Sequence, residues 1–457
     1  MPLDMPISSL ASIRLSKKRN LLVLLTFLML LFWIMGSCGK AYGSALKLED
    51  FPVPFVSGGF LNCTFVLASS DGHGPCGGAH TMDVMGAIMV SSSLGLKGDG
   101  GLVNAAMDDW ISTYDFQAVK VTVKDLSSNL VVVGGPGVNQ VTWHYNGLTD
   151  SNGNRILPVY FDKEENETDV IRVATSGTTY KIEYENGKVK ADYGIVLIFQ
   201  ESGRYVLILA GLGGGGTWAS CKVVSEFEKY GIAGEAIIVK YYDSNSDGFL
   251  DAVSIVENNI YTAKQTLSIN SFPLIGLSLT PLMPKLKSLR KSFLRRLKVP
   301  VAASLIFLMI FLTVMANVSS APVFEIYTLN DFPVPFVSGG FMNCTFVLAS
   351  SDGHGPCGGA HTMDVMGAIM VSSSLGLKGD GGMVNAAMDD WISTYDFQAV
   401  KVTVKDLSSN LVVVGGPGVN QVTWHYNGLT DSNGNRILPV YFDKEENETD
   451  VIRVATS

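Results

Sequence analysis

The chain has 457 residues, of which 47% are hydrophobic and only 16% are charged, and its formal net charge is −9. At about 150 residues per domain this length predicts about three domains, and the abundance of Val, Ile, Leu and Phe excludes a disordered chain. Residues 1–43 and 261–321 hold 13 of the 33 basic residues and one acid, which leaves a net charge of −21 on the remainder. Such an acidic remainder argues against a nucleic-acid partner, because nucleic acid requires a basic footprint.

The N-terminus has the pattern of an export leader. A basic segment that ends at Arg19 precedes an apolar run, Leu21–Met35, and Ala41-Tyr42-Gly43 has the small-x-small form of a cleavage site. We therefore interpret residues 1–43 as a signal peptide or an uncleaved N-terminal anchor. Both alternatives predict an exported protein of the cell surface or cell envelope.

The segment 44–260 is typical of one complete α/β module. Helical spacing predicts helices at Met82–Leu94, Val138–His144 and Thr217–Tyr230. Apolar or alternating runs predict strands, with a closing β-hairpin at the end; the strands are expected at 60–68, 118–123, 130–133, 156–161, 170–173, 180–183, 193–199, 205–210, 236–242 and 250–256. Because strands alternate with helices through Gly-rich loops, we expect strand–helix units on a substantially parallel sheet.

A second leader-like pattern lies in the middle of the chain. Residues 261–298 form a linker that becomes strongly basic, and residues 299–321 contain an apolar run followed by small residues. This pattern predicts a second signal-like or transmembrane segment. The excess of Lys and Arg places both basic segments in the cytoplasm, so the modules are expected outside, with membrane contact through the apolar segments.

Residues 322–457 contain a near-identical, truncated repeat of the first module. Residues 331–457 match 50–176 at an offset of 281, over 127 positions. The repeat stops before any equivalent of the predicted strands at 193–199 and 205–210. Two interpretations stay open: two tandem genes for exported proteins read as one frame, or a two-module protein with an internal membrane span. The only two differences are Leu61 against Met342 and Leu102 against Met383.

Short motifs follow one another in a fixed order along the module. They are Asp50–Val56, Asp83–Ala87, Val131–Asn139, Tyr193-Gly194-Ile195 and Ala210-Gly211. This series resembles the archaeal surface-layer (S-layer) protein family, which implies an exported, glycosylated structural coat protein whose partners are copies of itself or other surface-layer subunits. A more distant resemblance to bacterial cell-wall-binding modules, through the Val-x-x-x-Gly-Gly strand end, leaves a module that binds a cell-surface polymer as an alternative.

The loop Gly211–Gly216 fits the G-x-G-x-x-G pattern between a predicted strand and a predicted helix. In dinucleotide-binding folds such glycines let a pyrophosphate approach the helix N-terminus. The acid expected about 20 residues further on is missing, so tight strand–helix packing is the favoured interpretation. A nucleotide-binding enzyme is the less favoured alternative, and because no catalytic constellation stands out we expect no enzyme.

An acidic segment between the last two predicted strands carries the strongest chemical signal. Oxygen ligands with the spacing of a calcium loop are supplied by Asp243, Asn245, Asp247, the Phe249 carbonyl and Asp251. Position 12 of this loop is Ser254 instead of Glu, and its flanks are predicted strands. We therefore expect a hairpin clamped weakly by Ca²⁺, with an acidic turn that binds no metal as the alternative.

Cysteines and glycosylation triplets fit an exported protein. Cys63 and Cys76 are the local candidates for a disulfide, and buried free thiols are the alternative. A loop metal site is a weaker hypothesis, because the spacing matches no zinc signature; its residues would be His73, Cys76, His80 and Asp83. Asn-x-Thr triplets predict glycosylation at Asn62, Asn166, Asn343 and Asn447.

Overall fold

The computed structural model describes residues 46–262 and 329–454, apart from 70–71, 73–75, 102, 125–126, 248, 351–356, 358, 406–408 and 446–449. The two predicted leader or transmembrane segments, 1–43 and 299–321, lie outside these residues. Within the part of the chain that the structure describes, no helix is long and apolar enough to cross a membrane.

The first copy is built on an eight-stranded mixed sheet. Its order is β16 (Ala252–Ile260), β15 (Ala236–Tyr242), β13 (Lys188–Glu201), β14 (Arg204–Gly211), β8 (Asn129–Val133), β3 (Cys63–Leu67) and β5 (Asn104–Met107), with β12 (Glu183–Glu185) beside β13. Strands β14, β8, β3 and β5 are parallel to one another, whereas β13, β15 and β16 pair in antiparallel fashion.

The expectation of a substantially parallel sheet is therefore wrong. Strands β13 and β14 are joined by a two-residue turn, Ser202-Gly203, in which both residues have positive φ angles, 49° and 87°. Such turns match the twist of an antiparallel hairpin, so β14 runs back along β13. A continuous apolar run is the same in a buried strand of either direction, and for this reason the sequence pattern did not reveal the reversal.

Helices cover both faces of this sheet. Helix α2 (Thr81–Leu96) and helix α5 (Gly214–Ser225), followed by α6 (Phe227–Tyr230), pack on the face that carries Leu207 and Leu209. Helix α4 (Gln140–Asn146) packs on the opposite face, with Val206 and Ile208, because successive side chains of a strand point to opposite faces. The second face also carries a small antiparallel sheet of β9 (Val159–Lys163), β10 (Asp169–Val173) and β11 (Thr179–Tyr180).

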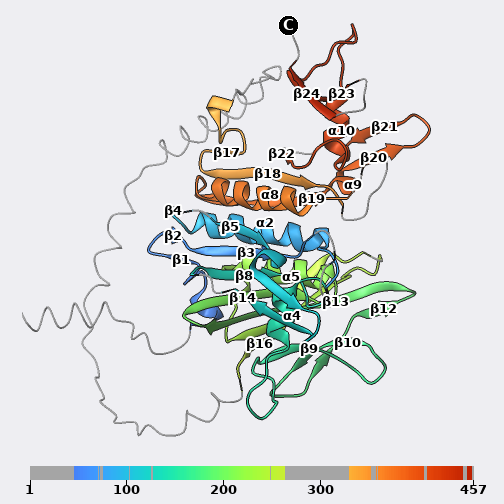
Figure 1. The fold of residues 1–457 in the computed structure, drawn as a ribbon. Coiled ribbons are helices and arrows are strands. Elements are labelled where there is room, and N and C mark those ends of the chain that lie inside the picture. Colours follow the sequence, from blue (N-terminus) through green and yellow to red (C-terminus); the bar gives the residue numbers. More distant parts are fainter. Residues whose placement is uncertain are drawn as a thin grey trace, which may run out of the picture.

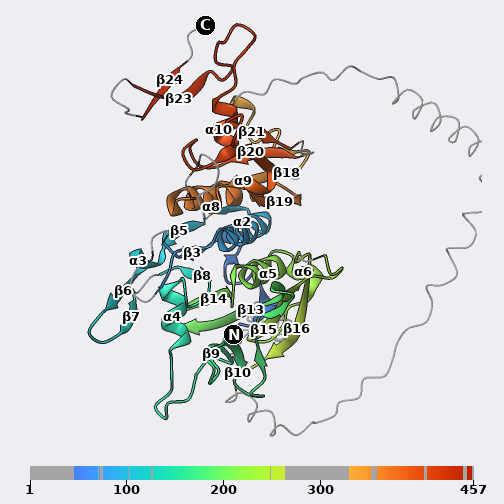
Figure 2. The ribbon, with the colours of Figure 1, turned by 90° about the vertical axis from the view of Figure 1, so that its right-hand side faces the viewer.

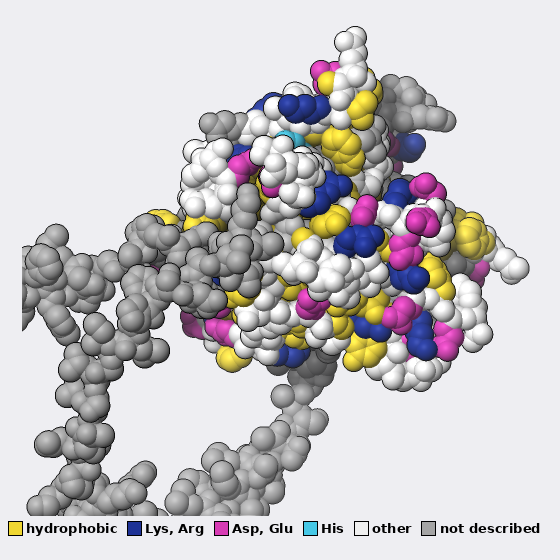
Figure 3. Space-filling view, turned by 90° about the horizontal axis from the view of Figure 1, so that it is seen from below, with side chains coloured by type: hydrophobic (Ala, Val, Ile, Leu, Met, Phe, Trp, Pro, Cys, Tyr) yellow, Lys and Arg dark blue, Asp and Glu magenta, His cyan; other side chains and the backbone are white. Residues whose placement is uncertain are grey.

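Short elements complete the first copy. They are η1 (Leu48–Asp50), β1 (Val56–Ser57), β2 (Phe60–Leu61), β4 (Gly100–Gly101), α3 (Asp108–Ile111), β6 (Ser112–Asp115) and β7 (Lys120–Val123). Seen from below, basic and acidic side chains are interleaved over the surface (Figure 3). On the β9–β10 hairpin, Arg172 pairs with Asp162 at 3.0 Å. Exposed pairs of this kind contribute about 0–1 kcal/mol each, so the folding of this copy depends on its two apolar layers.

The second copy repeats the first up to β10. Its elements are η2 (Leu329–Asp331), β17 (Val337–Ser338), β18 (Phe341–Leu348), α8 (Thr362–Gly376), β19 (Gly381–Met388), α9 (Asp389–Ile392), β20 (Ser393–Asp396), β21 (Lys401–Val404), β22 (Asn410–Val413), α10 (Gln421–Asn427), β23 (Val440–Lys444) and β24 (Asp450–Val454). Its main sheet has β18 between β19 and β22. Figures 1 and 2 show the two copies stacked, with α2 and α8 side by side between them.

Candidate functional site

Three strand–helix loops meet at one edge of the first copy's sheet: those from β3 to α2, from β8 to α4 and from β14 to α5. In open α/β sheets this edge is where ligands bind. The loops touch directly, since the Gly77 N–H donates to the Gly137 carbonyl at 2.8 Å. A Cβ on Gly135 would lie 2.6 Å from the Gly211 carbonyl oxygen. Glycine is therefore needed at position 135 for close packing between loops.

Asp192 of β13 occupies the place of an anion at the N-terminus of α5. Its Oδ2 accepts the Gly216 N–H at 2.7 Å, and its Oδ1 accepts those of Gly213 at 3.2 Å and Tyr193 at 2.7 Å. Burial raises the pKa of Asp192, and these hydrogen bonds oppose the shift. In dinucleotide-binding loops such N–H groups bind phosphate. Here an internal carboxylate satisfies them, so the geometry favours strand–helix packing over nucleotide binding.

Asp83 and His80 cap helix α2. The Asp83 carboxylate accepts the backbone N–H of His80 at 3.3 Å, and the His80 Nδ1 accepts that of Met82 at 3.2 Å. Asp83 also bonds to the Thr217 side chain of α5, and burial raises its pKa to about 7. These residues, considered above as metal ligands, thus stabilise the helix start, while His73 lies outside the described residues.

The predicted calcium loop forms an exposed turn between β15 and β16. The Asp243 Oδ1 accepts N–H groups of Asn245 at 3.2 Å and Ser246 at 2.6 Å. Asp251 accepts the backbone N–H of Ser244 at 2.8 Å, and Asp247 accepts that of Phe249 at 2.9 Å. The described residues contain no group of three or more His, Cys, Asp or Glu side chains arranged to share a metal ion. Binding of Ca²⁺ would require these carboxylates to turn from the loop amides toward the ion.

Cys63 and Cys76 are free, buried thiols, so the expected disulfide between them is not formed. Cys63 begins β3, whereas the Cys76 Sγ lies 3.4 Å from the Pro136 carbonyl oxygen, beyond the opposite end of the sheet. At about 3.3 Å per residue the length of β3 separates the two sulphurs. Burial raises the pKa of each thiol to about 12.

Three of the four predicted glycosylation residues are exposed. Asn166 lies in the turn between β9 and β10, Asn62 directly precedes β3, and its equivalent Asn343 lies in β18. Asn447 falls outside the described residues. The exposed side chains are accessible to a glycosyltransferase in the folded protein.

The contact between the two copies is made by equivalent residues. Ser91 Oγ of α2 and Ser372 Oγ of α8 lie 2.5 Å apart, and their numbers differ by the repeat offset of 281. Gly95 and Gly376 are also equivalent, and a Cβ built on either would lie 3.0 Å from the Cα of the other. Because residue i contacts residue j and j contacts i, this is the pattern of an isologous, twofold interface.

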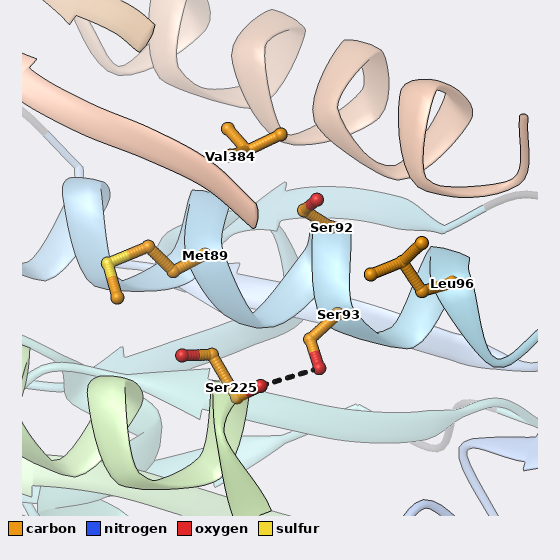
Figure 4. Close-up of a pocket in the computed structure, with 6 residues that line it drawn as sticks. All are labelled: Met89, Ser92, Ser93, Leu96, Ser225 and Val384. Atoms are coloured by element: carbon orange, nitrogen blue, oxygen red, sulfur yellow. Dashed lines mark hydrogen bonds between the residues drawn. The ribbon is translucent and has the colours of Figure 1, made fainter. Parts of the chain in front are cut away.

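The neighbouring contacts obey the same symmetry. A Cβ on Gly98 would lie 3.2 Å from Leu377, and a Cβ on the equivalent Gly379 would lie 3.2 Å from Leu96. One hydrophobic cluster runs through both copies. Beside it Met89, Ser92, Ser93, Leu96, Ser225 and Val384 line a cavity of about 30 Å³, shown in Figure 4. A cavity of this size can hold one water molecule.

One of the two sequence differences lies in this interface. Ser92 Oγ donates to the Met342 sulphur at 3.6 Å. The symmetric contact would join Ser373 to position 61, where Leu61 offers no acceptor, and Ser373 Oγ is buried without a hydrogen-bond partner among the described residues. The contact is therefore close to symmetric but not identical on its two sides.

Sequence reasoning missed both this contact and Asp192. The available signal was the group of small residues Ser91, Ser92, Ser93 and Gly95 on a helix that is otherwise mostly apolar. Small side chains let two helices approach closely. Comparison with protein-family models, with curated proteins and with solved structures finds no match for this chain.

Proposed function

We propose that the protein is a structural component of an exported cell-surface assembly, built from modules that recognise copies of themselves. The observation that carries this proposal is the reciprocal contact of α2 with α8 through Ser91, Gly95 and their equivalents. A module whose partner is its own copy is the unit that a homopolymeric coat requires. The resemblance to surface-layer proteins and the exposed Asn62 and Asn166 agree with this role.

The contact closes within one molecule here, and the same faces can also pair between molecules. Residues 263–328 separate the two copies in the sequence. The faces of one chain can therefore meet each other or those of another chain. Pairing within the chain should dominate at low protein concentration, because the two faces belong to one covalent chain. At high concentration, exchange of partners would join chains through the same surfaces.

The glycine-rich loop gives less support to an enzyme. The N–H groups that a nucleotide phosphate would need are hydrogen-bonded to Asp192. We also propose that Ca²⁺ stabilises the β15–β16 hairpin, through reorientation of Asp243, Asp247 and Asp251. Their oxygen atoms are the ligand type that Ca²⁺ prefers.

Sedimentation velocity and electron microscopy of the full chain test the structural role. We expect particles larger than the monomer, as sheets or rings, at rising protein concentration. Gly95→Leu should reduce their formation, because a side chain at position 95 meets the backbone of α8. A chain that stays monomeric at every concentration, with and without Ca²⁺, would contradict the proposal.

A further inference from the structure

The second copy exposes residues on both faces of its sheet that the first copy covers. Met89 of α2 is 8% exposed, and its equivalent Met370 of α8 is 46% exposed. Ile171 of β10 is fully buried, and its equivalent Ile452 of β24 is 67% exposed. The residues are the same in the two copies, so the difference comes from what lies against them. In the first copy that cover is made by β13, β14 and α5.

The edge of the main sheet of the second copy shows the same difference. Strand β8 pairs with β3 on one side and with β14, in parallel, on the other. Its equivalent β22 pairs with β18, and among the described residues no strand pairs with its other edge. An edge of this kind presents unpaired backbone N–H and C=O groups to a further strand. The free edge of Leu411–Val413 can therefore pair with a further strand.

Helix α8 has an open surface on which a helix could pack. In the first copy Gly86 lies against α5, where a Cβ on Gly86 would be 2.7 Å from Cys221 Sγ. At the equivalent Gly367 nothing lies within 4 Å of such a Cβ. Ser93 donates to the Ser225 carbonyl of α5 at 2.8 Å, as Figure 4 shows.

The equivalent of Ser93 has no such acceptor to reach. Ser374 Oγ donates to the carbonyl of Met370, in its own helix, at 2.9 Å. The strand edge of β22 and the surface of α8 thus lie open together, in the arrangement that receives β14 and α5 in the first copy.

We propose that this open face of the second copy, formed by β22 and α8, binds a strand–glycine loop–helix segment of the β14–α5 kind, carried by a partner polypeptide. Its strand would pair in parallel with β22. The register would follow that of β14 on β8, where Val206 pairs with Leu130, so the partner residue equivalent to Val206 lies opposite Leu411. Its helix would cross α8 at Gly367, where only glycine leaves room.

Binding of a synthetic peptide to the full chain tests this proposal. The peptide carries residues 204–225 with Cys221→Ser and a fluorescent label, and a peptide of the same composition in scrambled order is the control. We expect saturable binding by fluorescence anisotropy for the first peptide only. The full-chain variant Gly367→Leu should weaken binding at least tenfold, because its side chain fills the place of the incoming helix.

Three further variants distinguish specific docking from non-specific adhesion to an apolar surface. Leu411→Cys should form a disulfide with a peptide that carries Val206→Cys, whereas Thr403→Cys, exposed on β21, should not. Phe397→Ala, which removes another exposed ring, should bind as the unaltered chain does. Since a Cβ at position 367 would meet no atom within 4 Å, the circular dichroism of Gly367→Leu should not change.

Three results would overturn the proposal. They are an absence of saturable binding, equal binding by Gly367→Leu, or equal cross-linking at positions 403 and 411. A dimer of the full chain that Gly367→Leu abolishes, without peptide binding, would assign the face to a second copy of this chain instead.

Discussion

The two copies form a natural comparison, because 125 of their 127 aligned residues are identical and yet their burial differs. Val159, Ile171 and Val173 are fully buried in the first copy, and their equivalents in β23 and β24 are exposed. The β-hairpins themselves form in the same register in both copies. Local structure therefore follows the local sequence, whereas the hydrophobic core depends on the β13–β16 half that only the first copy has in the described part of the chain.

Matched substitutions in the two hairpins should give the largest difference. Ile171→Ala removes a fully buried side chain and should lower the free energy of unfolding of the first copy by about 2–5 kcal/mol. Ile452→Ala should change the free energy of unfolding of the second copy by less than about 0.5 kcal/mol, because its side chain is exposed. Hydrogen exchange in urea measures each copy separately, the first through β13–β16 peptides that occur once in the chain and the second through peptides that contain Met342 or Met383. Equal losses in the two variants would show that the second hairpin is also covered.

Calcium should act on the first copy only, through the β15–β16 turn. Binding to the folded state alone stabilises by about 2.7 kcal/mol at a hundredfold excess over Kd. The rise in melting temperature with Ca²⁺ should disappear in Asp243→Ala/Asp247→Ala. If the double variant and the unaltered chain melt alike with calcium and with chelator, the loop is a turn without a metal.

The buried Asp83 should make the first copy less stable as the pH rises. Its pKa is 3.8 in an unperturbed carboxyl and about 7 here, so between these values the folded state holds a proton that the unfolded state has released. Stability is then greatest below about pH 4 as far as this group is concerned, and it falls by about 1.4 kcal/mol per pH unit up to about pH 7. Asp83→Asn keeps the hydrogen-bond acceptor and should remove this slope in urea titrations at pH 4–7. An unchanged slope would assign the pH dependence to other groups.

The sequence predicted the position of elements better than their direction. The helix expected at Met82–Leu94 is observed at Thr81–Leu96, because apolar spacing and the capping residues His80 and Asp83 define it locally. The direction of β14 depends on the φ angles of Ser202 and Gly203, which apolar patterns do not encode.

The candidate interface was beyond local patterns as well. Ser91 and Gly95 are compatible with ordinary packing inside one module, and only the placement of α8 shows that they meet their own equivalents. In the same way, the Gly211–Gly216 loop matches a phosphate-binding pattern. It is the distant Asp192 that fills the anion position.

The central claim is that the two copies meet through the same face, and a cysteine pair tests it directly. Ser91 and Ser372 have their Oγ atoms 2.5 Å apart, close enough for sulphur atoms at these positions to bond. Ser91→Cys/Ser372→Cys should form a disulfide within one chain under mild oxidation, seen as a shift in the monomer band that reductant reverses. Ser91→Cys/Ser374→Cys, with its second cysteine on the open side of α8, should not. Absence of the first disulfide, or equal formation of both, would contradict the twofold contact.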